Sequence, residues 1–515
     1  MPRPLAPNPT DRRMNLSQTE GNGAAAGVAF PRSREAAMAH DLVISGGRVV
    51  TGAGSFDGDV AVQDGRIVAL GHGLEGRERV GAAGRLVLPG AVDGHVHMRT
   101  ERDSFCYDDT FATGSIAAAF GGTTTIIDQI QAEPDRTLVE EFDTRMALAE
   151  GQCAVDFAFH MNIRSSDPAR LAEIPEIVGR GIPSFKWFMA IPGWAVPDET
   201  LQRGMIEVAA FGGLNIVHAE NMGTIKALRQ RKVEAGDRDM RRFPSAYPAA
   251  TEGAACELAL GMAEAAGSRI LLFHQTCAEG VSAIRRAKER DVSAFGEAGL
   301  AWLTHDSSIY EANQVAALPF LLTPPVRGPE HQAALWRGLR LGDLDIVSTD
   351  HAAVRMVPED AAREIAAGFG VDVRADPEGP DTPRDDQGRR LMPVLPPGNV
   401  ETRFPLIHSE GVAKGRLGLE RWVEVCCTAP ADLFDLPQKG RLLPGCDADI
   451  VIFDPAAQVT YATEKLHSNT DYSVWDGWDC QGRIDMVFSR GRRIVDGEAY
   501  LGQADHGCYL ARSAS

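Results

Sequence analysis

Hydrophobic and polar residues alternate in short runs near both ends of the chain, a pattern typical of half-buried β-strands. In one early run, Asp64-Gly65 stands between two alternating stretches and predicts a tight hairpin turn. The two groups lie far apart in sequence, so we predict one small β-sandwich domain built from residues 41–88 and 440–500. The runs are Asp41–Val50, Asp59–Leu70, Ala448–Asp454, Asp485–Phe488 and Arg492–Asp496.

The middle of the chain, residues 89–439, alternates apolar runs with helical patterns such as Leu138–Ala149 and Gly253–Ala266. Eight βα units of this kind predict an α/β protein with a (β/α)8 TIM barrel. An open doubly wound sheet is the alternative, but no glycine-rich phosphate loop follows the first strand. The eight expected strands are Val87–Met98, Thr123–Gln129, Ala154–Met161, Ser184–Ala190, Asn215–Glu220, Arg269–Thr276, Val292–Ala298 and Asp345–Ala352.

Three segments fall outside these elements. Residues 1–40 are rich in Pro, Arg, Ser, Gly and Ala and predict a disordered N-terminal extension without the apolar stretch of a secretory signal. Residues 501–515 are expected to form a C-terminal tail. Val354–Asn399 is charged and rich in Pro and Gly, and it follows the eighth strand, so it would lie over the barrel mouth. Both a lid and a solvated surface insertion are consistent with that composition.

Composition and charge narrow the classes of function. The chain has 515 residues, 44% of them hydrophobic, which is enough for a sizeable core, and a formal net charge of −19. Such an acidic chain repels phosphate backbones, so we expect no nucleic-acid partner. No apolar run reaches the roughly 18 residues of a membrane span. The 9 cysteines form no CxxC pair, which favours a reducing, cytoplasmic location.

Polar residues at the ends of the predicted strands carry the chemistry. His95 and His97 close the first strand, and residues two apart in a strand point the same way, so the pair is half of a metal site. An HxH pattern alone also occurs in buried cores. However, four further ionisable side chains end or interrupt apolar runs, where a barrel places catalytic groups: Lys186, His218, His274 and Asp350.

Lys186 lies inside the apolar run SFKWFMA, where an ammonium ion is costly and the pKa should fall. A neutral lysine amine can react with carbon dioxide to form a carbamate, whose two oxygens can bridge two metal ions. Two metal ions can hold a hydroxide between them at neutral pH. Asp350 would then take the proton of the hydroxide and pass it to the leaving nitrogen.

These residues resemble the amidohydrolase superfamily, and specifically the hydantoinase and dihydropyrimidinase family of cyclic amidohydrolases. The resemblance implies a binuclear metal-dependent hydrolase that opens a cyclic amide or ureide ring at a C–N bond, with zinc as the usual metal and a homotetramer or homodimer as the assembly. It rests on these segments: LVLPGAVDGHVHM, AAAFGGTTTIID, SFKWFMA, VHAEN, TPPVR, STDHA, VETRFPLIHSEGVAKGR, KGRLLPGCDADIVIFDP and NTDYSVWDGW.

The resemblance also implies a role for each ligand. His95 and His97 would bind the buried ion, and His218 and His274 the second ion. Lys186 would be the N6-carboxylated bridge. Asp350 would bind the buried ion and act as general base and acid.

Departures from the family concern the substrate. Ile191 stands where hydantoinases have a tyrosine that polarises the scissile carbonyl. The usual hydrogen-bond donor is therefore missing, unless Tyr107 supplies it. Thr323 stands where the family has a serine, and its backbone can still bind a ring amide. Asn399 is expected to supply a second amide contact.

Arg99 points to a different substrate. The stretch HVHMR matches the HxHxR pattern of dihydroorotases, in which the arginine grips a substrate carboxylate. The alternative for Arg99 is a solvent-facing side chain paired with Glu101 or Asp103. Two other functions therefore stay open: an allantoinase- or dihydroorotase-like hydrolase of a carboxylated ring, and a non-catalytic dihydropyrimidinase-related scaffold. The intact set of six ligands argues against the scaffold.

Overall fold

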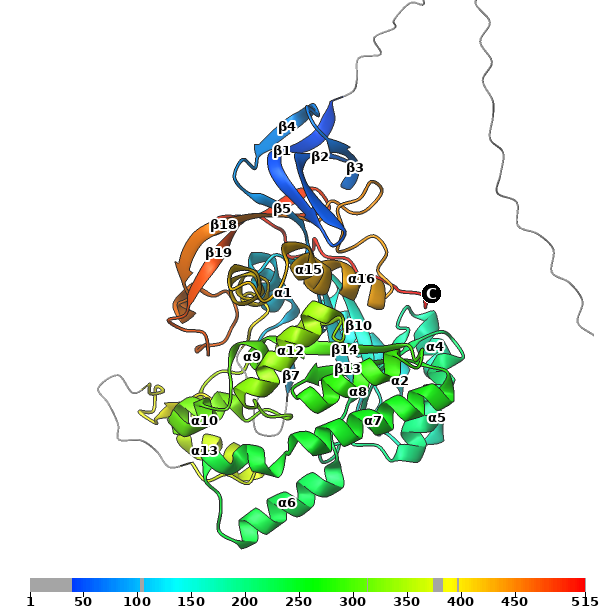
Figure 1. The fold of residues 1–515 in the computed structure, drawn as a ribbon, viewed down its shortest axis with the longest axis vertical. Coiled ribbons are helices and arrows are strands. Elements are labelled where there is room, and N and C mark those ends of the chain that lie inside the picture. Colours follow the sequence, from blue (N-terminus) through cyan, green and yellow to red (C-terminus); the bar gives the residue numbers. More distant parts are fainter. Residues whose placement is uncertain (1–38, 102–105, 313, 374–382, 396–397, 515) are drawn as a thin grey trace, which may run out of the picture. The chain divides into compact units, whose positions relative to one another are not determined.

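The computed structural model describes residues 39–101, 106–312, 314–373, 383–395 and 398–514 (Figure 1). The predicted N-terminal extension, residues 1–40, lies almost wholly outside the described residues. Two parts of the segment Val354–Asn399, residues 374–382 and 396–397, also lie outside them. The described chain forms an eight-stranded parallel sheet, a nine-stranded sheet and two short β-ribbons, β7 (Thr100–Glu101) with β8 (Cys106–Tyr107) and β16 (Val357–Pro358) with β17 (Leu391–Met392).

The eight-stranded sheet confirms the predicted barrel. Each strand pairs in parallel with the next, and the last strand meets the first through a parallel bridge between Val96 and His351. The backbone N–H of His97 also donates to the carbonyl of His351 at 2.7 Å. The strands are β6 (Ala91–Val96), β9 (Thr123–Gln131), β10 (Asp156–Asn162), β11 (Ser184–Phe188), β12 (Leu214–His218), β13 (Arg269–Gln275), β14 (Ala294–Gly299) and β15 (Ile346–Ser348).

The prediction of one strand over Val87–Met98 is wrong. β5 (Leu86–Pro89) pairs antiparallel with the C-terminal strand β18, and β6 of the barrel begins after Gly90. A Cβ at Gly90 would lie 2.1 Å from the Thr124 hydroxyl oxygen, so only glycine fits this crossing. The apolar run Leu86–Val92 therefore contributes one strand to the nine-stranded sheet and the start of another to the barrel.

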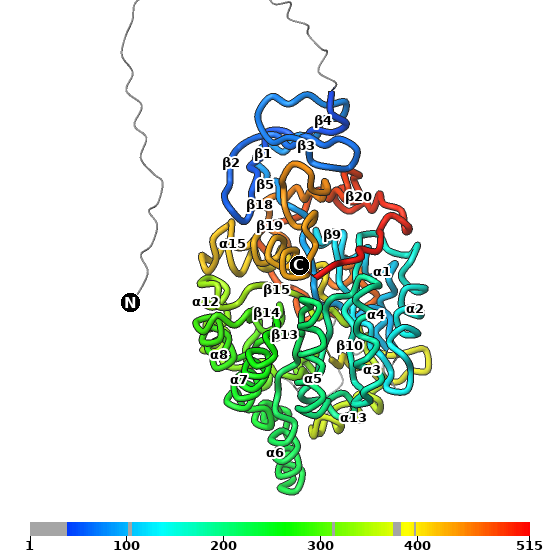
Figure 2. The backbone as a smooth tube through the Cα atoms, turned by 90° about the vertical axis from the view of Figure 1, so that its right-hand side faces the viewer, coloured from blue at the N-terminus to red at the C-terminus, as the bar shows by residue number. Residues whose placement is uncertain are grey.

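Helices follow the barrel strands and cover their outer side (Figures 1 and 2). Some begin at side-chain caps: the Thr137 hydroxyl at the start of α2, for example, accepts from the Glu140 N–H at 3.1 Å. The predicted helical patterns correspond to α2 and α7. These covering helices are α1 (Phe111–Phe120), α2 (Leu138–Ala149), α5 (Asp198–Ala209), α7 (Ala249–Ala266), α8 (Ala278–Lys288) and α12 (Pro329–Leu341), whereas α6 (Met222–Glu234) and α13 (Glu359–Gly368) belong to connections at the strand ends.

Shorter helices complete the connections between these elements. They are α3 (Pro168–Leu171), α4 (Ile174–Gly179), α9 (Leu300–Thr304), α10 (Ile309–Ala312), α11 (Gln314–Ala317), α14 (Arg403–Ile407), α15 (Leu419–Val423) and α16 (Ala429–Leu433). Nowhere in the described parts of the chain is a helix both long and apolar enough to cross a membrane.

Both ends of the chain build the nine-stranded sheet, as the alternating runs predict. The hairpin turn at Asp64 and Gly65 has φ values of 50° and 74°, which a type I′ turn requires. The boundaries 41–88, 440–500 and 89–439 for separate domains stay a prediction. The strands are β1 (His40–Thr51), β2 (Gly54–Gln63), β3 (Arg66–Gly71), β4 (Gly76–Gly81), β5, β18 (Ile450–Thr460), β19 (Asp479–Ser489), β20 (Arg492–Asp496) and β21 (Ala499–Tyr500).

The end of the described chain packs against the barrel. Tyr509 forms a parallel bridge with Phe157 of β10. The Arg512 side chain is buried, and one of its nitrogens donates to the Ser184 hydroxyl at 2.9 Å. Contacts of this kind hold the segment predicted as a tail against the starts of β10 and β11.

Candidate active site

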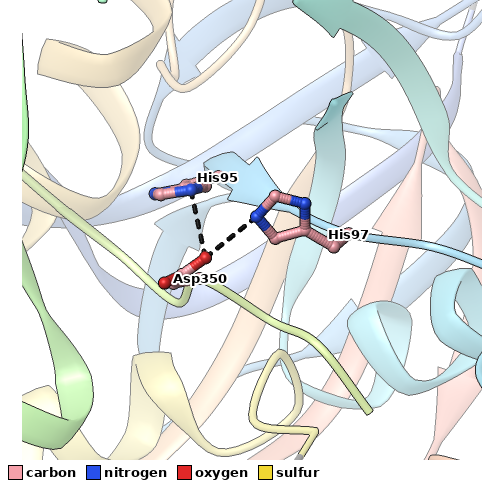
Figure 3. Close-up of side chains that lie close together, drawn as sticks. All are labelled: His95, His97 and Asp350. Atoms are coloured by element: carbon pink, nitrogen blue, oxygen red, sulfur yellow. Dashed lines mark hydrogen bonds and ion pairs between the residues drawn. The ribbon is translucent and has the colours of Figure 1, made fainter. Parts of the chain in front are cut away.

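Three side chains meet where β6 and β15 end. Nε2 of His95 and Nε2 of His97 each lie 3.0 Å from Oδ1 of Asp350 (Figure 3). The ligating atoms of the three residues all lie within 4.8 Å of one another. Burial lowers the pKa of both imidazoles, although Asp350 opposes the shift, and a ring in the neutral form keeps a lone pair for a metal ion.

A second pair of imidazoles stands at the ends of β12 and β13. Nδ1 of His218 and Nε2 of His274 lie 3.1 Å apart. Two nitrogens bound to one tetrahedral zinc ion, at bonds of about 2.0–2.1 Å, are separated by about 3.3 Å. The separation found here therefore fits two ligands of a single ion.

Lys186 of β11 lies beside the first cluster, with its Nζ 3.1 Å from Nε2 of His95. Its side chain is 2% exposed. Burial lowers the pKa of Lys186, although the charges of Asp350 and Glu297 oppose the shift. The neutral amine that carbamate formation needs is therefore accessible at lower pH than for an exposed lysine.

Glu297 of β14 is a site residue that the sequence analysis missed. Its Oε1 lies 3.1 Å from Nδ1 of His95 and accepts the backbone N–H of His274 at 3.0 Å, so one carboxylate contacts both histidine pairs. A metal-binding histidine usually has such a partner on its other nitrogen. The pattern that identified Lys186, one ionisable residue in an apolar run, would also have identified Glu297.

Glu220 is a second missed residue. Its Oε2 lies 2.9 Å from Nε2 of His218, the nitrogen that does not face His274. This contact fixes the orientation of the His218 ring. The residue stands two positions after His218, in the segment VHAEN, so its spacing already suggested the same side of the chain.

The backbone around Asp350 is strained and well supported. Asp350 has a φ of 52°, which non-glycine residues rarely adopt. On one side, the Thr349 hydroxyl donates to Asp93 at 2.7 Å. On the other, Nε2 of His351 lies 3.0 Å from Oδ2 of Asp109. The side-chain amide of Asn399 donates to the Thr349 carbonyl at 3.0 Å, which adds a third restraint.

The electrostatics of Asp350 favour the carboxylate. Burial alone would raise its pKa, but the His95 and His97 imidazoles outweigh burial and hold that pKa well below its usual range. The side chain is therefore ionised at neutral pH, as a metal ligand and proton acceptor must be.

A cavity of about 480 Å³ opens above these groups. His97, Lys186, His218, His274 and Asp350 form its floor. Of the four residues predicted to bind substrate, Ile191 and Thr323 line the cavity. Tyr107 lines it as well, with its ring centroid 5.7 Å from that of His97.

The other two predicted substrate residues lie elsewhere. Neither Arg99 nor Asn399 is among the described residues that line the cavity. The Arg99 side chain is 45% exposed, with Nη1 3.9 Å from Oδ1 of Asp108. Asn399 is buried behind Asp350, where it contacts Thr349 and His351.

The segment Val354–Asn399 contributes to the cavity wall. Gly368 at the end of α13, Phe369 and Leu395 all line the cavity. The described part of this segment therefore forms part of the cavity wall, and both the lid and the solvated insertion stay predictions.

A parallel barrel with imidazole, carboxylate and lysine side chains at the ends of its strands has the architecture of a metal-dependent hydrolase. A family model supports this class: the model of the amidohydrolase family matches residues 86–494. The chain belongs to the amidohydrolase family. Members of this family are typically metal-dependent, and the cluster of His95, His97 and Asp350 is suited to a metal ion.

Individual relatives agree with this assignment. The chain is 36% identical to a D-hydantoinase of Streptomyces coelicolor, over 92% of this chain and 99% of the relative. It is 33% identical to a D-phenylhydantoinase of Escherichia coli, over 92% and 98% of the two chains. Among solved structures, a dihydropyrimidinase from Brevibacillus agri matches with a TM-score of 0.83 and 30% identity, over 92% and 99%.

Proposed function

We propose that the chain is a hydrolase that opens a cyclic amide or ureide ring at a C–N bond, as the names of its hydantoinase and dihydropyrimidinase relatives suggest. The observation that carries this proposal is the convergence of His97, His218, His274, Asp350 and a buried lysine on the floor of one cavity, with buried His95 in contact with Asp350 and the lysine. No relative of another activity is needed to explain this arrangement.

The proposed cofactors are two divalent metal ions, with zinc as the expected metal, because imidazole and carboxylate donors suit it. His95, His97 and Asp350 would hold one ion, and His218 and His274 the other. Lys186, N6-carboxylated, would contribute to both. When bound, the ions would acidify a water molecule and polarise the ring carbonyl.

Asp350 would move the proton. Its carboxylate lines the cavity and is ionised, so it can accept a proton from the attacking water. The same proton would then pass to the ring nitrogen as the C–N bond breaks. The water oxygen stays on the carbonyl carbon, so the product is a carboxylate, and a hydantoin would yield an N-carbamoyl amino acid.

Other residues would orient the ring. The Tyr107 hydroxyl is our choice for the donor to the scissile carbonyl, because Ile191 has no polar group and both residues line the cavity. The Thr323 backbone would bind a ring amide. Asn399 would act as a positioning residue, since it contacts the backbone on both sides of Asp350.

We also propose a homotetramer or homodimer in the cytoplasm. The assembly follows from the resemblance to hydantoinases. The location follows from the sequence, in which the 9 cysteines show no disulfide or secretory pattern.

The test is ring opening by zinc-loaded protein supplied with bicarbonate. The panel contains hydantoins, dihydropyrimidines, cyclic imides, allantoin and dihydroorotate, and the metal content is measured on the same sample. We expect two ions per chain and turnover of hydantoins or dihydropyrimidines. Turnover confined to dihydroorotate would favour the carboxylated-ring hydrolase, and turnover confined to the neutral allantoin would favour an allantoinase-like enzyme. A chain that binds no metal and opens no ring would be a scaffold.

A further inference from the structure

One face of α6 forms part of the cavity wall. Met222, Ile225, Lys226 and Arg229 all line the cavity, and their spacing places them on one side of the helix. The helix begins directly after His218 and Glu220, with Asn221 as its cap. This face therefore leads from the metal-binding floor outward, and α6 projects beyond the neighbouring helices (Figure 2).

The face changes character along its length. Met222 and Ile225 are apolar, whereas Lys226 and Arg229 are cations. At a rise of 1.5 Å per residue, Lys226 lies about 6 Å and Arg229 about 10 Å beyond Met222 along the axis. A substituent that follows this wall meets an apolar stretch first and positive charge afterwards.

The two cations differ in how they are held. Arg229 donates to the carbonyl of Gly368 and bonds the Tyr247 hydroxyl, so its guanidinium is fixed at the wall between α6 and α13. Lys226 is exposed and makes no hydrogen bond or ion pair with the residues that the structure describes. Its ammonium group can therefore turn toward a ligand without breaking an existing contact.

The carboxylates that line the cavity lie at its floor. Glu220 contacts His218, and Asp350 contacts His95 and His97, whereas Lys226 and Arg229 lie farther along α6. The chain as a whole carries a formal net charge of −19. Two cations on the cavity face of α6 thus give this part of the wall a positive charge in an otherwise acidic chain. A positive wall favours an anionic substituent over a neutral one.

We propose that Lys226 and Arg229 bind a carboxylate at the end of the substituent on the substrate ring. This inference rests on the proposed function and names its substrate class: cyclic amides whose substituent has a short apolar spacer and a terminal acid. The acid is thus bound at α6. Arg99, which the sequence suggested for this role, is not among the residues lining the cavity.

The experiment compares two hydantoins on the zinc-loaded full chain. One carries a 2-carboxyethyl group at ring position 5, and the other the neutral 2-carbamoylethyl group of the same shape. Values of kcat/KM are measured for wild type, Lys226→Met and Lys226→Glu. Arg231→Met serves as the matched control, because Arg231 is an exposed cation of the same helix outside the cavity lining.

We expect wild type to favour the acid, and Lys226→Met to lose roughly tenfold on the acid while the amide changes less than about twofold. Lys226→Glu should reverse the preference, and added salt should weaken the preference for the acid in wild type. Arg231→Met should behave as wild type.

Equal loss on both hydantoins would overturn the inference, because Lys226 would then act on the ring or the product. An absent preference for the acid in wild type would also overturn it. If no hydantoin is opened, calorimetric binding of the acid and the amide decides the inference separately, and the proposed function fails only if no ring of the panel is opened. Acid binding that does not depend on Lys226 would then reject it.

Discussion

The floor and the mouth of the cavity are built in different ways. The floor consists of side chains at the ends of barrel strands, and most of them contact one another at hydrogen-bond distance. The mouth consists of α6, α13, the turn at Ile191 and the segment around Thr323. The rigid strands fix the groups proposed for the reaction, whereas helices and loops line the space proposed for the rest of the substrate.

This contrast predicts that substitutions in the floor lower turnover, and that substitutions in the mouth change which substrate is preferred.

The largest effect is expected at Asp350. Asp350→Asn removes the proton acceptor and a charged metal ligand, so kcat should fall at least about a thousandfold on every ring. Steady-state kinetics and metal analysis test this. Asp108→Asn, the same change at a carboxylate outside the cavity, is the control. A variant that keeps a tenth of wild-type activity would contradict the role.

A smaller effect is expected directly behind the floor. Asn399→Ala removes the amide that holds the Thr349 carbonyl, so Asp350 should lose orientation and kcat should fall about tenfold. KM should stay within about twofold, because Asn399 is not among the residues lining the cavity. Kinetics and a thermal melt on the same sample separate this effect from unfolding. A raised KM with unchanged kcat would instead support the substrate contact expected from the sequence.

At the mouth, Ile191 combines a cavity position with an unusual backbone. Its φ is 77°, a strained value for a β-branched residue. Ile191→Gly should raise the free energy of unfolding by about 1 kcal/mol, raise KM severalfold and leave kcat within about threefold. Urea unfolding and kinetics measure these quantities. Ile191→Ala removes the same bulk but keeps a Cβ, so it should raise KM without gaining stability. Equal stability of the two variants would show that strain is not relieved.

The smallest effect is expected outside both regions. Arg99→Ala removes a half-exposed cation near Asp108, and exposed ion pairs contribute about 0–1 kcal/mol. Turnover of neutral and acidic rings should therefore stay within about twofold of wild type. Loss on acidic rings alone would restore the hypothesis of an Arg99–carboxylate contact and weaken the contrast between floor and mouth.

The residues of the floor carry a local signal in the sequence. Lys186, His218 and His274 each end or interrupt an apolar run, and parallel strands of a barrel bring such positions to one end. Glu297 carried the same signal. The prediction for the first strand is wrong because the apolar run Leu86–Val92 looks continuous, although the Pro89-Gly90 pair within it is a turn signal and stands at the crossing between the two sheets.

The mouth could not be predicted in the same way. Lys226 and Arg229 look like ordinary residues of a polar helix, and only the placement of α6 beside the cavity separates them from Arg231. Asn399 belongs to a long connection without periodicity, so its position behind Asp350 depends on packing between distant segments. Functional roles that depend on such packing leave little trace in a single sequence.

The pairing of β5 with β18 has a consequence for synthesis of the chain. Leu86–Pro89 meets residues 450–453, which leave the ribosome roughly 360 residues later. At about 5–20 residues per second, the apolar edge of β5 therefore waits roughly 20–70 s for its neighbour. An unpaired apolar strand edge is prone to aggregation during that delay. Growth at lower temperature, or chaperones that cover nascent strands, should therefore raise the yield of folded protein more than a mutation that stabilises the folded state.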